Sequence, residues 1–250
     1  MKLAELVEYL DDYLRINEAG DWANALNGLQ VENSGNVNRL AVAVDACEAV
    51  INAAAGQGAS FLLVHHGLFW PGLEPLRGRT YRKFASLIKA DIAVYAAHLP
   101  LDRHPEVGNN AVLARLLGVD VRGTWAEEKG AEIGVWGEID LSRDAFTSRI
   151  SQVLAAMPRL VPAGPATVRR VGVVTGAGSS LIREASRQGF DTFVTGEGPH
   201  HSFFDAEELG INVYYAGHYA TETVGVKMLG RHLNERFGIP WSFIDHPTGF

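Results

Sequence analysis

The stretch Phe61–Gly67, FLLVHHG, determines how the rest of the chain is interpreted. A short apolar run that ends in turn-forming residues is typical of a strand buried on both faces of a parallel sheet. Runs of the same kind recur at Leu40–Asp45, Ile92–His98, Val171–Gly176 and Ile211–His218. Segments with helical spacing of apolar residues lie between these runs, and the alternation predicts an α/β protein with mostly parallel sheets.

Two such sets of strands and helices flank a shorter middle region, Thr124–Pro165. Within it, Glu132–Asp140 alternates like a strand and Arg143–Met157 has helical spacing. A length of 250 residues is compatible with one large domain or with two lobes. We predict two α/β lobes, one over residues 1–123 and the other over residues 124–250.

The composition excludes several classes of protein. Lys and Arg number 22 against 29 Asp and Glu, a net charge of −7, whereas nucleic-acid binding normally needs a basic face. The single cysteine cannot form an internal disulfide, which favours a reducing compartment. Acidic residues interrupt the apolar positions near the N-terminus, and no run of about 18 apolar residues occurs. We therefore expect a cytoplasmic protein with no membrane or nucleic-acid partner.

Histidines and carboxylates follow three of the predicted strands. In open α/β sheets, ligands bind at the carboxyl ends of the strands, so these side chains are candidates for one site. Their positions at the predicted strand ends are unlike those of His104, His232 and His246, which we expect to be structural or on the surface. The candidate ligands are His65, His66 and Asp102 in the first lobe and His218 and Glu222 in the second.

Each group taken alone also has a structural explanation. The histidine pair can be hydrogen-bonded at a strand end, and Asp102 can cap the next segment after a loop fixed by Pro100. Thr221 can cap the helix that we predict over Thr221–Phe237, with Glu222 favoured by the helix dipole in its first turn.

Taken together, the five groups are too many for one tetrahedral ion and suit two divalent ions about 3.5–4 Å apart. Imidazole and carboxylate ligands admit Zn, Fe, Mn, Co or Ni. Two such ions outweigh the charge of the two carboxylates, so the site would acidify water and attract the anionic oxygens of phosphate.

Two further loops contain polar residues after strands. Thr195–Ala206 carries Glu197, His200 and His201, which are either groups for proton transfer or ordinary polar loop residues. The glycine-rich Thr175–Ser180 lacks the third glycine of a dinucleotide fingerprint and the lysine of a P-loop, so we expect only a tight turn there.

Several segments, in order along nearly the whole chain, resemble the YbgI-type, or NIF-three-like, dinuclear metal proteins, often named type 2 homologues of GTP cyclohydrolase I. The resemblance implies two α/β lobes with a dimetal site in the cleft between them, and a homohexamer built as a trimer of dimers. It places the metal ligands on the same five residues, with His98 supporting them nearby. The middle region is too short for the inserted domain of longer members. The segments are Asn27–Asn33, Leu62–Trp70, Ala96–Asp102, Gly108–Gly118, Val194–His201 and Ala216–Glu222.

These expectations favour a metal-dependent hydrolase that acts on a small, nucleotide-like substrate bearing phosphate. Glu197, His200 or His201 would transfer protons, and the resemblance suggests opening of the imidazole ring of the guanine in GTP. The alternative is a non-enzymatic metal protein: a carrier, a regulator or an interaction scaffold. Turnover that depends on the metal ligands distinguishes the two.

Overall fold

The structure is a computed structural model that describes residues 1–18 and 20–249. The chain divides into two compact units, and each has its own sheet. Unit 1 comprises Met1–Val107 and Gly225–His246, and unit 2 comprises Gly108–Val224 with the last residues from Pro247. The predicted α/β class with two sheets is confirmed. In the described part of the chain, no helix has both the length and the apolar run that a membrane span requires.

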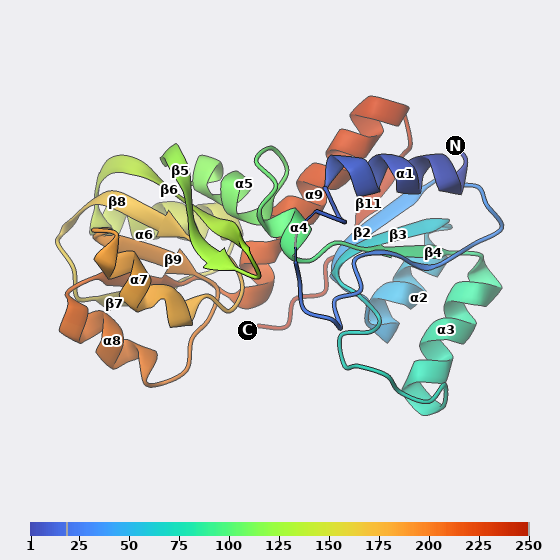
Figure 1. The fold of residues 1–250 in the computed structure, drawn as a ribbon, viewed down its shortest axis with the longest axis horizontal. Coiled ribbons are helices and arrows are strands. Elements are labelled where there is room, and N and C mark those ends of the chain that lie inside the picture. Colours follow the sequence, from blue (N-terminus) through green and yellow to red (C-terminus); the bar gives the residue numbers. More distant parts are fainter. Residues whose placement is uncertain (19, 250) are drawn as a thin grey trace. The chain divides into compact units, whose positions relative to one another are not determined.

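Unit 1 is built on a five-stranded sheet in the order β1-β4-β3-β2-β11. Only β1 is antiparallel to its neighbour, so this sheet matches the predicted parallel arrangement. Helix α1 covers one face of the sheet, and α2 and α3 cover the other (Figure 1). The strands are β1 (Gly28–Val31), β2 (Leu40–Asp45), β3 (Phe61–His66), β4 (Ala93–Ala96) and β11 (Trp241–Phe243), and the helices are α1 (Leu3–Tyr13), α2 (Glu48–Gly56), α3 (Gly78–Ala90) and α4 (Leu99–Asp102).

The apolar runs that predicted these strands form the core of unit 1. Leu62 and Val64 of β3 pack in one buried cluster with Ile51 of α2 and Leu87 of α3. Consecutive strand residues alternate between the two faces, and both faces are covered, so the whole run is apolar. The carboxyl ends of β2, β3 and β4 lie at one edge of the sheet because these strands are parallel.

Unit 2 is built on a six-stranded sheet in the order β5-β6-β8-β9-β10-β7. Its central strands β8, β9 and β10 are parallel, but the flanking strands are antiparallel, so this sheet is mixed instead of mostly parallel. The strands are β5 (Asp120–Glu128), β6 (Ala131–Ser142), β7 (Arg159–Pro162), β8 (Thr167–Val173), β9 (Thr192–Thr195) and β10 (Asn212–Tyr215). The helical segments are α5 (Asn109–Leu116), α6 (Arg143–Leu154), η1 (Ser179–Leu181), α7 (Ile182–Arg187), α8 (Ser202–Leu209) and the N-terminal part of α9 (His218–Phe237).

The division into units differs from the predicted boundary between residues 123 and 124. It falls after Val107 and again inside α9, between Val224 and Gly225. The segment Gly225–His246 belongs to unit 1 because β11 adds to its sheet, with Trp241 paired to Leu40 of β2. Sequence order therefore does not separate the two units.

Two elements beside the predicted ligands also differ from expectation. Leu99–Asp102 is one helical turn, not a loop, because proline is tolerated in the first turn of a helix, where its missing N–H has no helical partner. Helix α9 begins at His218, three residues earlier than predicted. Thr221 is therefore inside the helix, where its hydroxyl donates to the carbonyl of His218 at 2.9 Å, and it is not the N-cap.

Candidate metal-binding residues

His65 and His66 are the last two residues of β3. Neighbouring side chains normally point to opposite faces of a strand, but the strand ends here and the two ring centroids are 4.7 Å apart. His65 Nδ1 lies 2.9 Å from the carbonyl oxygen of Ala97, and His66 Nδ1 lies 2.9 Å from Oδ1 of Asp45. Both oxygens are acceptors, so Nδ1 donates and Nε2 of each neutral ring keeps the lone pair that a metal ion needs.

His98 follows β4 and is held by a loop residue far away in sequence. Its Nδ1 donates to Oδ1 of Asp21 at 2.9 Å, and Oδ2 of Asp21 accepts from the backbone N–H of Leu99 at 2.9 Å. Burial alone would raise the pKa of Asp21, but the hydrogen bond and charge of His98, with hydrogen bonds from Asn27 and Trp22, hold it below its usual value. Asp21 is therefore an ionised acceptor that fixes the ring of His98.

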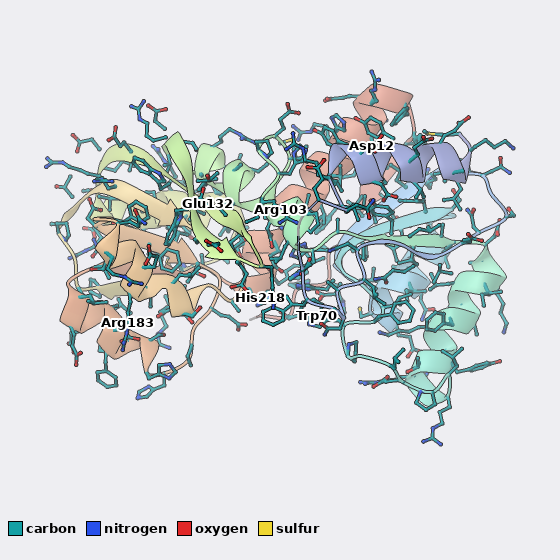
Figure 2. All side chains as sticks on the ribbon, viewed as in Figure 1. Asp12, Trp70, Arg103, Glu132, Arg183 and His218 are labelled. Carbon is teal, nitrogen blue, oxygen red and sulfur yellow. The ribbon has the colours of Figure 1, made fainter. Side chains whose placement is uncertain are left out.

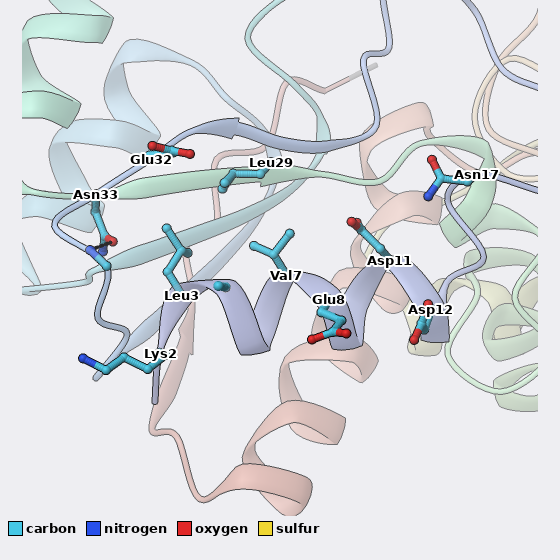
Figure 3. Close-up of a pocket in the computed structure, with 12 residues that line it drawn as sticks. Lys2, Leu3, Val7, Glu8, Asp11, Asp12, Asn17, Leu29, Glu32 and Asn33 are labelled. Carbon is cyan, nitrogen blue, oxygen red and sulfur yellow. Dashed lines mark hydrogen bonds between the residues drawn. The ribbon is translucent and has the colours of Figure 1, made fainter.

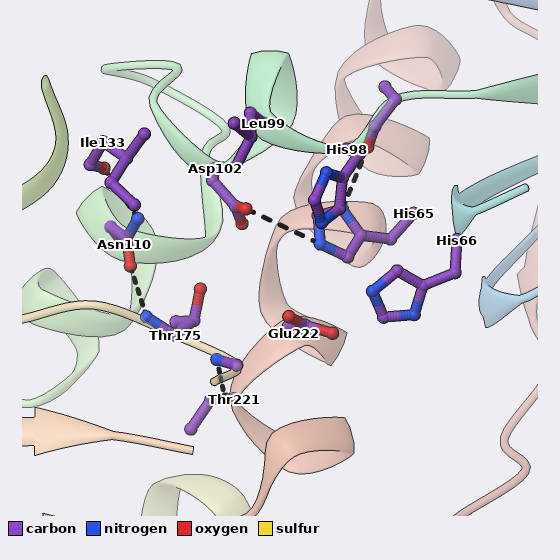
Figure 4. A network of polar contacts seen from close by, with 12 residues as sticks. His65, His66, His98, Leu99, Asp102, Asn110, Ile133, Thr175, Thr221 and Glu222 are labelled. Carbon is purple, nitrogen blue, oxygen red and sulfur yellow. Dashed lines mark hydrogen bonds and ion pairs between the residues drawn. The ribbon is translucent and has the colours of Figure 1, made fainter. Parts of the chain in front are cut away.

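The three histidines of unit 1 form a group that could hold a metal ion. One ligand atom from each of His65, His66 and His98 lies within 4.8 Å of the others. The short helix α4 brings in Asp102, whose Oδ2 is 3.7 Å from Nε2 of His65 (Figure 4). The structure thus brings together the three ligands predicted in this unit, and it places His98 beside them in a position equivalent to a ligand.

Unit 2 contributes a histidine and a glutamate from the N-terminal end of α9. His218 and Glu222 are four residues apart on the helix, with Nε2 and Oε2 separated by 3.2 Å. On the other side of the ring, Nδ1 of His218 donates to Oε1 of Glu197 at 2.8 Å. Burial alone would lower the pKa of His218, but Glu222 and then Glu197 raise it from 6.5 to about 9. Because of these two carboxylates, the His218 ring keeps its proton at neutral pH when no metal is bound.

The glycine-rich turn after β8 packs against the Glu222 carboxylate. Gly176 has a φ of +65°, and a Cβ at this position would collide with Oε1 of Glu222. Its backbone N–H donates to the hydroxyl of Thr221 at 3.1 Å, and the preceding Thr175 N–H donates to Asn110 at 2.7 Å (Figure 4). The predicted tight turn therefore lies directly against one side of the Glu222 carboxylate.

One feature is common to all four histidines. Each offers Nδ1 to an oxygen of the protein, which is a carboxylate in three cases and a backbone carbonyl in one. Metal-binding histidines almost always have such a partner, because it fixes the tautomer and the direction of Nε2. The donor set therefore fits divalent metal ions of the type that prefer imidazole and carboxylate.

Sequence reasoning missed two of these carboxylates. Asp45 ends the predicted strand Leu40–Asp45 and is paired with His66 in the register of β2 and β3, so its position at the strand end was a usable signal. Asp21 lies in an irregular segment 77 residues before His98, and nothing in its local sequence indicates the contact.

The residues predicted to transfer protons have different surroundings. Glu197 is bound to His218, as described above. His200 and His201 are exposed; the rings of His200 and Phe204 are nearly perpendicular, with centroids 5.6 Å apart, and His201 precedes α8. The structural role expected for His104 agrees with its burial and its contact of 3.0 Å with the carbonyl of Tyr13.

A groove of about 750 Å³ lies elsewhere in unit 1, along α1 and β1 (Figure 3). Leu3 and Val7 of α1 point toward Leu29 of β1, and carboxylates from Glu8 to Glu32 surround them. None of its described lining residues is a histidine, so the groove is chemically distinct from the candidate ligands.

Comparison with known proteins identifies the family to which the chain belongs. A family model described as Duf34/NIF3 (NGG1p interacting factor 3) matches residues 1–248. A protein of Pyrococcus horikoshii, named GTP cyclohydrolase 1 type 2 homolog, is 43% identical over 253 residues, which cover 98% of each chain. The crystal structure of TTHA1606 from Thermus thermophilus has a TM-score of 0.92 and 44% identity over 100% of both chains. The protein ybgI, of unknown function, has a TM-score of 0.91 and 39% identity over 99% of both. This chain therefore belongs to the Duf34/NIF3 family.

Proposed function

We propose that the chain binds two divalent metal ions and hydrolyses a small, nucleotide-like substrate that bears phosphate. The observation that carries the proposal is the set of histidines whose Nδ1 atoms are all held by protein oxygens. The name GTP cyclohydrolase 1 type 2 homolog, which many relatives carry, supports a guanine nucleotide as the first substrate to test. The residues proposed to hold the ions are His65, His66, Asp102, His218 and Glu222, with His98 beside them.

The donor set supports transition metals in preference to Mg²⁺ or Ca²⁺. Four imidazoles and two carboxylates are available, whereas Mg²⁺ and Ca²⁺ prefer oxygen ligands alone. When bound, a pair of divalent ions supplies Lewis acidity and lowers the pKa of water. Asp21, Asp45 and Glu197 then act by holding the rings in the direction that binding requires.

Proton transfer is proposed for the loop after β9. His200 and His201 are exposed, so either can exchange protons with solvent and with a leaving group. Glu197 holds the His218 ring through one carboxylate oxygen, and its other oxygen remains able to accept a proton.

The test combines metal analysis with turnover of GTP. Protein loaded with Mn²⁺, Zn²⁺, Fe²⁺, Co²⁺ or Ni²⁺ is expected to hold two ions per chain and to convert GTP. His65→Ala and Glu222→Gln should lose both properties, whereas His246→Ala, which changes an exposed histidine outside the ligand set, should keep them. Two bound ions without turnover of GTP or other nucleotides would overturn the enzymatic proposal and favour a metal carrier or regulator.

The homohexamer implied by the family resemblance is likewise a proposal. A chain of 27.1 kDa should then form a species of six times that mass in light scattering. A stable monomer at micromolar concentration would contradict it.

A further inference from the structure

Trp70 has an unusual position for a tryptophan. It lies on the loop between β3 and α3 (Figure 2) and is 36% exposed, although tryptophan is highly buried on average. Its ring centroid is 4.6 Å from that of His98 and 5.4 Å from that of His66. An indole that is open to solvent therefore borders the group of histidines proposed to bind metal.

The loop that carries Trp70 is fixed to the segment from Asp21 to Gln30, which ends within β1. The side-chain amide of Asn24 donates to the carbonyl of Trp70 at 2.5 Å. Gln30 accepts from the backbone N–H of Leu68 at 2.7 Å and donates to the carbonyl of Ala25 at 3.1 Å. At Gly67 a Cβ would collide with the Gln30 side chain, so the glycine allows this close approach.

The segment from Asp21 to Gln30 also positions His98. Asn27 accepts from the backbone N–H of His98 at 2.7 Å and donates to Asp21 at 2.7 Å, and Asp21 holds the ring of His98. The segment from Asp21 to Gln30 thus connects the backbone of the Trp70 loop to His98 through side-chain hydrogen bonds. Hydrogen bonds of this kind keep the side chains of a binding site in a fixed geometry before the ligand binds.

We propose that Trp70 is a substrate-positioning residue, whose exposed indole stacks on a planar heteroaromatic ring of the substrate. Stacking would place that ring beside His66 and His98. An aromatic side chain offers this contact to any flat ring, because every nucleobase has a π-face. The proposal rests on the proposed function, because the ring would belong to the substrate of the hydrolase. The stacking itself can be measured separately, as binding.

The experiment measures the binding of guanosine and of ribose 5-phosphate to the full chain by equilibrium dialysis, with and without Zn²⁺. Trp70→Ala is expected to weaken guanosine binding about tenfold or more. Trp70→Phe should keep most of the affinity, and ribose 5-phosphate should bind all variants alike. Tyr81→Ala, which removes an exposed aromatic side chain of α3, is the matched control.

The metal content of the variants distinguishes two roles for Trp70. The residue could position the substrate, or it could hold the histidines that bind metal. Trp70→Ala should retain the zinc stoichiometry of the unaltered protein. Equal guanosine affinity in Trp70→Ala, equal losses for both probes, loss of zinc, or no measurable guanosine binding by the unaltered protein would each overturn the proposal. If guanosine affinity depends on Trp70 but no nucleotide is hydrolysed, the stacking site stands and the proposed hydrolase does not.

Discussion

The Nδ1 atom of His66 lies 2.9 Å from Oδ1 of Asp45, the residue paired with it in the register of β2 and β3. The contact is a consequence of the parallel sheet, which brings the last residues of adjacent strands to one edge. A carboxylate that accepts from Nδ1 fixes the tautomer and the orientation of the ring, and it leaves Nε2 on the side of the ring opposite Asp45. The sheet itself therefore positions one of the candidate metal ligands.

Replacing Asp45 tests this arrangement. Asp45→Asn keeps the size of the side chain but removes its charge, so we expect the affinity for Zn²⁺ to fall about 10- to 100-fold. The measurement is a competitive titration with a chromophoric chelator. Glu18→Gln, which neutralises an exposed carboxylate of the same unit, serves as the control and should leave the affinity unchanged. An unaltered affinity in Asp45→Asn would show that the contact with His66 has no role in metal binding.

Gly176 provides a test of how the backbone positions the Glu222 carboxylate. Ala at this position would have a left-handed backbone, which costs roughly 1–3 kcal/mol, and its Cβ would also displace the Glu222 carboxylate. Gly176→Ala should therefore lose both stability to urea and affinity for metal. Gly130→Ala is a matched control, because Gly130 has a φ of +84° and a Cβ there meets nothing within 4 Å. If both variants lose stability but keep metal affinity, Gly176 does not shape the ligand.

The strands of the candidate site could be predicted because their signal is local. The apolar run Leu40–Asp45 is a strand with the predicted bounds, and Phe61–His66 differs by one residue from its predicted range. A run buried on both faces is visible in the sequence without knowledge of its neighbours. The candidate ligands His65 and His66 end such a run, so the same local pattern predicts their position at the end of a strand.

Other elements depend on contacts that the sequence does not display. Arg159–Pro162 is an edge strand, where proline is tolerated because one side of the strand needs no ladder hydrogen bond. Trp241–Phe243 returns to the first sheet from the far end of the chain. Asp21 reaches His98 across 77 residues through an irregular segment. These pairings and contacts join residues far apart in the sequence, and local propensity does not determine them.

The His218 ring should titrate at high pH in the metal-free protein. Its pKa of about 9 exceeds the unperturbed value of 6.5, so its stabilising contribution is present below pH 6.5 and is lost as the pH rises through about 9. Because metal binding requires the neutral ring, zinc affinity should rise with pH until about 9. Histidine proton NMR of metal-free protein should show one resonance with this pKa, absent in His218→Gln.

Glu197 supplies the control for this titration. Glu197→Gln removes one of the two charges that raise the pKa of His218, so its resonance should titrate at lower pH than in the unaltered protein. His246→Gln, the control, should leave the pKa of the His218 resonance unchanged. An unshifted resonance in Glu197→Gln would mean that Glu222 alone sets the protonation of the ring.

His104 should make the stability of the protein sensitive to acid. Burial lowers its pKa below 6.5, against the opposing effects of the Tyr13 carbonyl and the Glu106 charge. The unfolded chain then binds a proton before the folded chain does, so the contribution is present above pH 6.5 and is lost as the pH falls from 6.5 toward the folded value. Urea unfolding at pH 7.5 and pH 5.5 should show a smaller difference in His104→Gln than in the unaltered protein. An equal difference in both would place the acid sensitivity at other groups, of which His232, whose pKa is also lowered by burial, is the next to replace.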